Sequence, residues 1–304
     1  MPEIHARVHG DIKPHWLRTP LRTGEDFAFV ARAVEEYALK TICSSGRCPN
    51  KAECWNNRTA TLMIMGDICT RSCRFCATAS GKPLPLQADE PGRVAGSIRR
   101  MGLRHAVVTS VTRDDLPDGG AAHWAATIAA IREANPETTI ETLIPDMEGV
   151  RSRVETIAAT RPEIIAHNIE CVERLTSAIR SRASYAVSLH TIEYVAASGI
   201  AAKSGLMVGL GESEGEVLRT LRDLRDAGAS IVTIGQYLQP TLRQVRVSEY
   251  ITPAQFERYR LAALEMGFSF VVSAPLVRSS YMAHRALEGL RHSEGHRALK
   301  AAGV

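Results

Sequence analysis

The order of apolar and polar positions predicts a regular alternation of strands and helices. A buried strand at 61–65 ends at Gly66, and six more apolar, β-branched runs follow at 105–110, 138–144, 163–168, 204–210, 231–236 and 268–273. Stretches with helical spacing separate these runs, at 91–102, 121–134, 148–160, 171–197, 214–227 and 253–266. Strand–helix alternation at about 30-residue spacing indicates consecutive βαβ units and a parallel sheet. We predict an α/β fold, a partial (β/α)6-7 TIM-type barrel that falls short of the full eightfold one.

Both ends of the chain extend beyond the barrel pattern. Apolar residues recur at helical spacing from Phe27 to Ala38, which predicts an amphipathic helix. A loop with Gly46 and Pro49 follows. We therefore divide the chain into an N-terminal arm, 1–60, a barrel, 61–275, and a C-terminal segment, 276–304, in which the stretch from 285 is polar and rich in arginine and histidine.

Composition and charge narrow the possible partners. The chain has 304 residues, 45% hydrophobic, with a net charge of +4. That charge is too small to predict nucleic-acid binding, but it suits an acidic protein partner. No run approaches the roughly 20 apolar residues of a membrane span, and the start resembles neither a secretion signal nor a transit peptide. We expect a cytoplasmic protein with neither nucleic acid nor membrane as a partner.

Six of the seven cysteines form two triplets, and these are the main candidates for chemistry. Thiols stay reduced in the cytosol, and an odd number of cysteines suits a disulfide framework poorly. Clustered thiolates are the usual ligands of iron–sulfur clusters. Three ligands leave one iron of a four-iron cluster open for an amino-acid-like ligand. The first triplet is Cys43, Cys48 and Cys54, spaced C-x4-C-x5-C, and the second is Cys69, Cys73 and Cys76, spaced C-x3-C-x2-C on the loop after the first strand.

Other interpretations of the triplets stay open at this point. A zinc ion completed by a distant His or Cys is the alternative for the second triplet, although zinc sites more often use C-x2-C pairs. For the first triplet, the alternative to an electron relay or a sulfur source is a zinc ion or cluster that only pins the N-terminal arm. Arg71 and Arg74 flank the second-triplet thiolates and either offset their charge or are solvated.

The second triplet is similar to the signature of the radical S-adenosylmethionine (SAM) enzymes, in which C-x3-C-x2-C follows the first barrel strand. The wider sequence resembles the lipoyl synthase family. This resemblance runs from about Lys13 to Ala283 and rests on the segments 59–61, 66–71, 108–120, 203–212, 234–240 and 278–281.

The resemblance implies a specific activity and cofactors. Lipoyl synthases insert two sulfur atoms, at C6 and C8, into an octanoyl chain carried on a lysine of a lipoyl carrier domain. The cofactors implied are SAM and two [4Fe-4S] clusters. By resemblance, Cys69, Cys73 and Cys76 hold the cluster that cleaves SAM, and Cys43, Cys48 and Cys54 hold an auxiliary cluster that is consumed as the sulfur donor. Matching position selects Ser280 over Ser279 as the auxiliary cluster's fourth ligand, so the predicted catalytic set is Cys69, Cys73, Cys76 and Ser280.

The resemblance also suggests which residues contact SAM. A glycine pair alone more often marks a tight turn than a binding site. In this family a glycine-rich stretch after a strand lines the SAM pocket, and polar residues at other strand ends contact the cofactor. The predicted SAM contacts are Gly209, Gly211, Glu212, Thr109, Glu141 and Asn168.

The implied partners are proteins. They are octanoylated lipoyl carrier domains (the E2 component of 2-oxoacid dehydrogenases and the glycine cleavage H protein), a flavodoxin or ferredoxin as electron donor, and an iron–sulfur cluster carrier. Departures from the family's usual residues concern substrate or carrier docking. They occur at Met147, Ala166, Gln244, Arg246 and Met282.

Two alternative functions remain. One is another radical SAM enzyme that inserts sulfur, such as a methylthiotransferase or a biotin-synthase-like protein, and the C-x4-C-x5-C arm argues against it. The other is a non-catalytic iron–sulfur or zinc module for electron transfer or binding. That function would leave the polar residues at the strand ends without a purpose.

Overall fold

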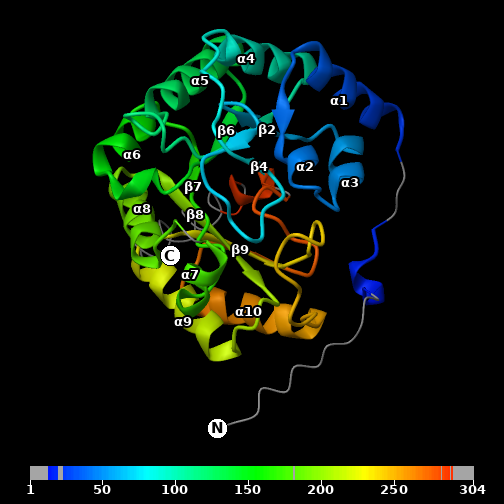
Figure 1. The fold of residues 1–304 in the computed structure, drawn as a ribbon, viewed down its shortest axis with the longest axis vertical. Coiled ribbons are helices and arrows are strands. Elements are labelled where there is room, and N and C mark those ends of the chain that lie inside the picture. Colours follow the sequence, from blue (N-terminus) through cyan, green and yellow to red (C-terminus); the bar gives the residue numbers. More distant parts are fainter. Residues whose placement is uncertain (1–12, 20–22, 181, 282, 288, 290–304) are drawn as a thin grey trace, which may run out of the picture.

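A computed structural model describes residues 13–19, 23–180, 182–281, 283–287 and 289. Seven parallel strands curve into an open barrel with helices on its outer face (Figure 1). This confirms the predicted partial barrel. One further strand, β1 (Lys40–Thr41), runs antiparallel beside β2 at one edge of the sheet. In sheet order, the parallel strands are β2 (Thr61–Ile64), β5 (His105–Ser110), β6 (Thr139–Leu143), β7 (Ile164–Ala166), β8 (Ala201–Val208), β9 (Ile231–Gln236) and β10 (Phe270–Ser273).

The connecting helices lie close to their predicted ranges, with one exception. The predicted single helix over 171–197 is two helices, because the first ends at Ile179 and the second has its own cap. That cap is Ser184, whose hydroxyl accepts a hydrogen bond from the backbone N–H of Val187. The helices are α4 (Glu90–Met101), α5 (Ala121–Ala134), α6 (Arg151–Ala158), α7 (Glu173–Ile179), α8 (Tyr185–Ala197), α9 (Glu214–Asp226) and α10 (Pro253–Glu265).

Two cysteines of the first triplet, Cys43 and Cys54, lie on short helices rather than in the predicted loop, and Cys48 lies in the turn between those helices. Those helices are α2 (Ile42–Ser45) and α3 (Lys51–Asn56), and the long helix α1 (Glu25–Glu36) packs against α3. The rings of Phe27 and Trp55 are 5.1 Å apart, and Lys51 Nζ lies 4.2 Å from the Trp55 ring. Trp55 is therefore a packing residue. A short 3-10 helix, η1 (His15–Leu17), precedes these elements.

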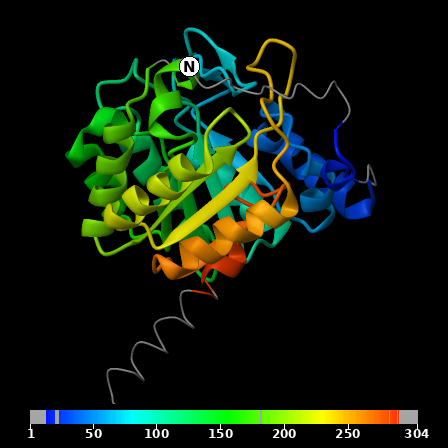
Figure 2. The same cartoon turned by 90° about the horizontal axis from the view of Figure 1, so that it is seen from below.

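Functional loops gather at the carboxyl end of the barrel. After β2, the second triplet begins on β3 (Ile68–Cys69), which pairs with β4 (Ala79–Ser80). Another short 3-10 helix, η2 (Met147–Gly149), follows β6. Figure 2 shows the loop around β3 and β4 (cyan) and the loop after β9 (gold) rising on the same side of the molecule. Within the described residues, no helix is long and apolar enough to cross a bilayer.

The chain beyond β10 returns to the inner side of the sheet, where Figure 1 shows it in red beside α2. It crosses the end of β9 so closely that a Cβ atom on Gly235 would lie 2.1 Å from the Val277 carbonyl oxygen. Glycine permits this approach because it has no side chain. Met282 and most of the predicted polar tail lie outside the described residues. The three-part division of the chain stays a prediction.

Candidate functional site

Both triplets contribute to one cavity of about 440 Å³ at the carboxyl end of the barrel. The ends of β5, β7, β8 and β9 supply most of its other walls. Two loops that are well separated in the sequence therefore face the same enclosed space, which allows one bound molecule to meet both. The cavity's cysteines are Cys43, Cys48, Cys69, Cys73 and Cys76.

The sulfur of Cys69 accepts hydrogen bonds from the main chain. The backbone N–H of Thr112 lies 3.3 Å from Cys69 Sγ, and that of Arg71 lies 3.4 Å from it. The Cys69 carbonyl also accepts from the backbone N–H of Gly81, at 2.9 Å. The main chain therefore holds the Cys69 sulfur in place at the cavity wall.

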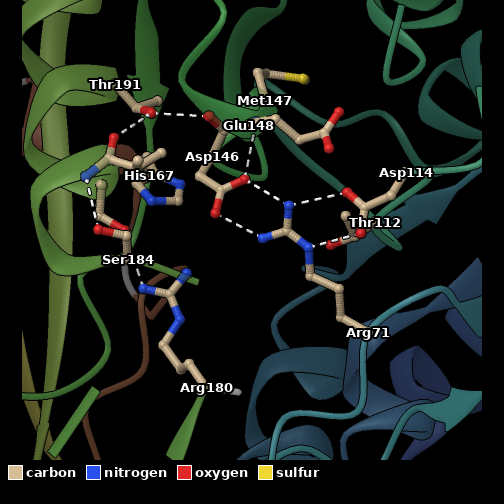
Figure 3. Close-up of polar contacts among 12 residues, drawn as sticks. Arg71, Thr112, Asp114, Asp146, Met147, Glu148, His167, Arg180, Ser184 and Thr191 are labelled. Carbon is tan, nitrogen blue, oxygen red and sulfur yellow. Dashed lines mark hydrogen bonds and ion pairs between the residues drawn. The ribbon is translucent and has the colours of Figure 1, made fainter. Parts of the chain in front are cut away.

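Arg71 ties the second-triplet loop to the ends of two strands (Figure 3). Its guanidinium donates two hydrogen bonds to Asp114, both of 2.9 Å, and two to Asp146, of 2.6 and 2.8 Å. The side chains of the three residues are only 8%, 11% and 2% exposed. Arg71 thus neither offsets the thiolates nor is solvated, the two possibilities that the sequence left open. Arg74 is exposed.

Charge stabilises Asp146 in its ionised form. Burial alone would raise the pKa of Asp146, but its hydrogen bonds with Arg71 and the charge of that residue lower it below the usual value. The backbone N–H of Glu148 adds a hydrogen bond of 3.0 Å to Asp146 Oδ1, and Thr191 donates to the Asp146 carbonyl (Figure 3). The ion pairs are therefore fixed from several sides.

Three buried polar atoms lining the cavity have no hydrogen-bond partner among the described residues: Ser110 Oγ, His167 Nε2 and Asn168 Oδ1. The His167 Nδ1 atom donates to the Ile144 carbonyl, at 3.0 Å, so Nε2 is an acceptor. Burial, and then the charge of Arg180, lower the pKa of His167 to about 4, which keeps it neutral. Buried unpaired groups are rare in proteins, so these atoms indicate a polar ligand.

The structure brings only two of the six predicted SAM contacts to the cavity. Thr109 lines it and donates to the Leu143 carbonyl, at 3.0 Å. Asn168 lines it too, and its amide nitrogen lies 3.2 Å from both Glu170 Oε1 and Ser279 Oγ. These two stay as candidates.

The other four predicted SAM contacts lie outside this cavity, and two of them, Glu141 and Glu212, bind other parts of the chain. The carboxylate of Glu141 is 2.6 Å from Lys203 Nζ, and both side chains are almost fully buried in the barrel interior. Burial would raise the pKa of Glu141, but the charge of Lys203 lowers it. Glu212 accepts from the backbone N–H groups of Gly209 and Leu210, so it shapes its own loop. Glu141, Gly209, Gly211 and Glu212 are not among the residues that line this cavity, and their contacts with SAM stay predictions.

Glu170 and Arg180 line the cavity although they are absent from the predicted site. Glu170 has a left-handed backbone, with φ of 67°, and its burial raises its pKa. Its place two residues after Asn168, at a strand end, was a usable signal. Arg180 lay within the predicted long helix and carried no such signal. It donates to the Ile169 carbonyl and to Ser188 Oγ, both at 3.1 Å.

Contacts to the C-terminal segment hold the first triplet in place. Asn50 donates to the Leu276 carbonyl at 2.6 Å, and Tyr281 donates to Glu53 Oε1 at 2.9 Å. Thr61 Oγ1 donates to Ser280 Oγ at 2.7 Å. These contacts bring Ser280 next to the first triplet.

The two adjacent serines face different parts of the site. Ser280 lines both the cavity already described and a second cavity, of about 740 Å³, to which Cys43, Cys48 and Cys54 contribute. Ser279 lines the first cavity and bonds to Asn168 instead. This arrangement favours Ser280 over Ser279 as a ligand at the first triplet.

The chemistry of the thiols fits iron–sulfur clusters. Burial, and then the nearby Cys48 and Cys43, raise the pKa of Cys54 to about 12, and burial raises that of Cys73 to about 11. Such thiols ionise only beside a strong positive charge, which iron supplies. Among the described residues, no three His, Cys, Asp or Glu side chains are arranged to hold one metal ion.

Comparisons with known proteins show the family to which the chain belongs. Residues 63–224 match the Radical SAM superfamily. Lipoyl synthase of Parabacteroides distasonis is 55% identical over 273 residues, covering 90% of this chain and 97% of that protein. Lipoyl synthase of Flavobacterium psychrophilum is 53% identical over 274 residues, with coverages of 90% and 94%. Among solved structures, methylornithine synthase (PylB) superimposes with a TM-score of 0.53 at 13% identity, over 69% of this chain and 70% of that one, and shows a shared fold.

Proposed function

Because this chain belongs to the lipoyl synthase family of the radical SAM superfamily, we propose that its two cysteine triplets hold the two clusters of that reaction. The protein is a sulfurtransferase that inserts two sulfur atoms, at C6 and C8 of a protein-bound octanoyl-lysine. Its cofactors are iron–sulfur clusters and SAM. The shared cavity carries the proposal, because the same acyl chain must reach both triplets.

We assign a separate role to each triplet. Cys69, Cys73 and Cys76 hold the cluster whose open iron binds SAM, and Cys43, Cys48 and Cys54 hold the auxiliary cluster. When bound, these cofactors supply the radical that removes hydrogen from the acyl chain and the sulfur that replaces it. Ser280 is the fourth ligand of the auxiliary cluster, and Thr61 positions it by donating a hydrogen bond to Ser280 Oγ.

The cavity has both polar and apolar walls, which suit the cofactor and the substrate respectively. Polar atoms of Thr109, Ser110, His167 and Asn168 lie on the barrel side and suit the polar parts of SAM. Apolar walls suit an acyl chain, because they bind carbon atoms and exclude water. The apolar residues of the cavity include Ile42, Met63, Val111, Leu143, Leu206 and Met207.

The protein acts on octanoylated lipoyl carrier domains. We propose the E2 component of 2-oxoacid dehydrogenases and the glycine cleavage H protein as these carriers. We also propose that a flavodoxin or ferredoxin supplies electrons, that an iron–sulfur cluster carrier renews the auxiliary cluster, and that the protein works in the cytoplasm. The mildly basic surface, with a net charge of +4, supports acidic protein partners.

An anaerobic assay with an octanoyl-lysine peptide tests this function. The loaded protein should contain about eight iron atoms in two four-iron clusters. Incubation with SAM and a reductant should raise the mass of the peptide by two sulfur atoms. SAM cleavage without sulfur gain would point to another substrate, and a colourless zinc protein would exclude radical chemistry.

Paired serine variants test the ligand assignment. Ser280→Ala should abolish dithiolated product and alter the spectrum of the auxiliary cluster, because it removes a ligand to iron. Ser279→Ala is the matched control, since Ser279 bonds to Asn168, and it should keep the auxiliary spectrum of the parent. The reverse result would transfer the ligand role to Ser279.

A further inference from the structure

The first triplet stands between two cavities that open at opposite ends of the barrel. Cys43 and Cys48 line both cavities, whereas Cys54 lines only the second and the Cys69–Cys76 triplet lines only the first. Ser280 and Arg278 are also shared. A cluster at the first triplet can therefore be approached from either side.

The residues that line the two cavities show that the cavities lie toward opposite ends of the barrel strands. On β5, His105 at the amino end lines the second cavity, and Ser110 at the carboxyl end lines the first. On β6, Thr139 and Leu143 divide in the same way. Along β5 the second cavity extends to Val107 and the first begins at Thr109, so the two cavities come within about two residues, roughly 7 Å, of each other. The two cavities therefore adjoin, and Cys43 and Cys48 of the first triplet lie in the wall that they share.

Cationic side chains outnumber acidic ones around the second cavity. Among the described residues, four cations line it, Lys51, Arg58, Arg104 and Arg278, against one carboxylate, Glu53. Arg58 is paired with Asp26, at 2.7 Å, so Arg104 is the better probe of the rim charge. Arg104, His284 and Asn57 are all exposed at the rim. A positive rim attracts anions and raises their local concentration.

The two cavities meet different chemical needs. An acyl chain and SAM fill the first cavity during the reaction, and neither needs the second. A sulfur-donating cluster is consumed, so the first triplet must be loaded again after each reaction. Four-iron clusters bound by thiolates carry a net negative charge, which the cationic rim of the second cavity complements.

We propose that the second cavity is the route by which a preassembled, anionic four-iron cluster reaches the first triplet. This inference rests on the proposed function. Each step exchanges one ligand: a cysteine thiol binds iron, the donor's thiolate leaves, and the cysteine proton moves to the leaving sulfur. Cys43, Cys48 and Cys54 react in this way, and the Ser280 hydroxyl does so at the fourth iron. Four thiols are released in total, and no electron is transferred.

Cluster loading of a full chain with Cys69, Cys73 and Cys76 changed to Ala tests the route, because only the first triplet then binds iron. The probe is a synthetic four-iron, four-sulfide cluster ligated by 2-mercaptoethanol, and visible absorption follows its transfer. Arg104→Glu with His284→Glu should slow loading by roughly tenfold at low salt, and by less at high salt, because the rim no longer attracts the anion. Ferrous iron and sulfide added separately should not show this slowing, since ferrous iron is a cation.

Lys13→Glu is the matched control, because Lys13 is an exposed cation that lines only the first cavity. It should leave the loading rate unchanged. If Lys13→Glu slows loading and the Arg104→Glu and His284→Glu pair does not, the cluster arrives through the substrate cavity and the proposal is wrong. An equal effect of the rim pair on both iron sources would mean that the cargo is not an assembled cluster.

A steric block gives an independent test in the wild-type chain without iron. Asn57→Trp places a large ring at the rim of the second cavity and should slow alkylation of Cys54 several-fold, measured by mass spectrometry. Alkylation of Cys76, which lines only the first cavity, should stay at the parent rate. Unchanged alkylation of Cys54 would contradict the proposed route. Neither test requires SAM, so a failure here is separate from a failure of sulfur insertion by the loaded enzyme.

Discussion

The two triplets are held by different kinds of contact. Buried ion pairs between Arg71 and two aspartates fix the loop of the second triplet to the barrel. The first triplet depends on single hydrogen bonds to a segment more than 200 residues away: Asn50 and Leu276 are 226 positions apart, and Thr61 and Ser280 are 219 apart. The triplet that we propose to hold the SAM-cleaving cluster is thus tied to the ends of barrel strands, whereas the triplet that we propose to hold the consumed cluster lies where the two ends of the chain meet.

The energies of these contacts support the contrast. A neutral hydrogen bond contributes about 1 kcal/mol net to stability, whereas breaking a buried ion pair costs about 3–5 kcal/mol because one charge is left unpaired. The second triplet should therefore resist changes that loosen the first. The following predictions test this difference, beginning with the largest effect.

Replacing Arg71 should disturb the second triplet most. Arg71→Met leaves the buried carboxylates of Asp114 and Asp146 without an opposite charge, so we expect the free energy of unfolding to fall by about 3–5 kcal/mol. The variant should also retain less iron at the second triplet. Urea unfolding and iron analysis measure the two effects.

Two further variants sharpen this test. Arg71→Met combined with Asp114→Asn and Asp146→Asn should recover part of the lost stability, because no buried charge remains. Arg74→Met, at an exposed site of the same loop, should change stability by about 0.5 kcal/mol or less. Equal effects of Arg71→Met and Arg74→Met would show that the buried ion pairs do not hold the second triplet more firmly than an exposed residue does.

Acid should weaken the carboxyl end of the barrel in two steps. The unfolded chain binds a proton at His167 below its usual pKa of 6.5, but burial holds the folded pKa at about 4. The free energy of unfolding should therefore fall between pH 6.5 and pH 4, by at most about 3 kcal/mol. Asp146, whose pKa Arg71 lowers against the effect of burial, adds a further loss at lower pH, below its usual value of 3.8.

Urea unfolding across this pH range measures the first step. His167→Gln removes the titrating group and should flatten the slope between pH 6.5 and pH 4. His190→Gln, at an exposed position on α8, is the matched control. A slope that persists in His167→Gln would assign the acid sensitivity to other groups.

The smallest expected effect is at the first triplet. Thr61→Val removes the donor to Ser280 Oγ and keeps the shape of the side chain, so stability should fall by only about 1 kcal/mol. The auxiliary cluster should nevertheless show an altered spectrum, because Ser280 loses its positioning contact. Thr61→Ser keeps the hydroxyl and should restore the spectrum. An unchanged spectrum in Thr61→Val would show that this contact does not position Ser280.

Local sequence patterns predicted most of the fold. The β-branched runs located the seven parallel strands, because strands buried on both faces read as continuous apolar segments. The break between α7 and α8 was missed, since residues 171–197 have helical character throughout and the cap at Ser184 is a single short-range signal. The spacing of the cysteines identified the two triplets as candidate metal-cluster sites.

Residue types and spacing predicted the chemistry of this protein, because two triplets of thiols close together in the chain suit iron–sulfur clusters, and the family resemblance assigned a role to each triplet. The tertiary structure determined which residues pair with the charged side chains. Arg71 pairs with carboxylates 43 and 75 positions away, and Glu141 pairs with Lys203, 62 positions away. Folding also placed the Cys54 side of the first triplet on a second cavity. Spacing in the sequence does not indicate which of these residues lie close together in space, because the curvature of the sheet sets which strand ends meet.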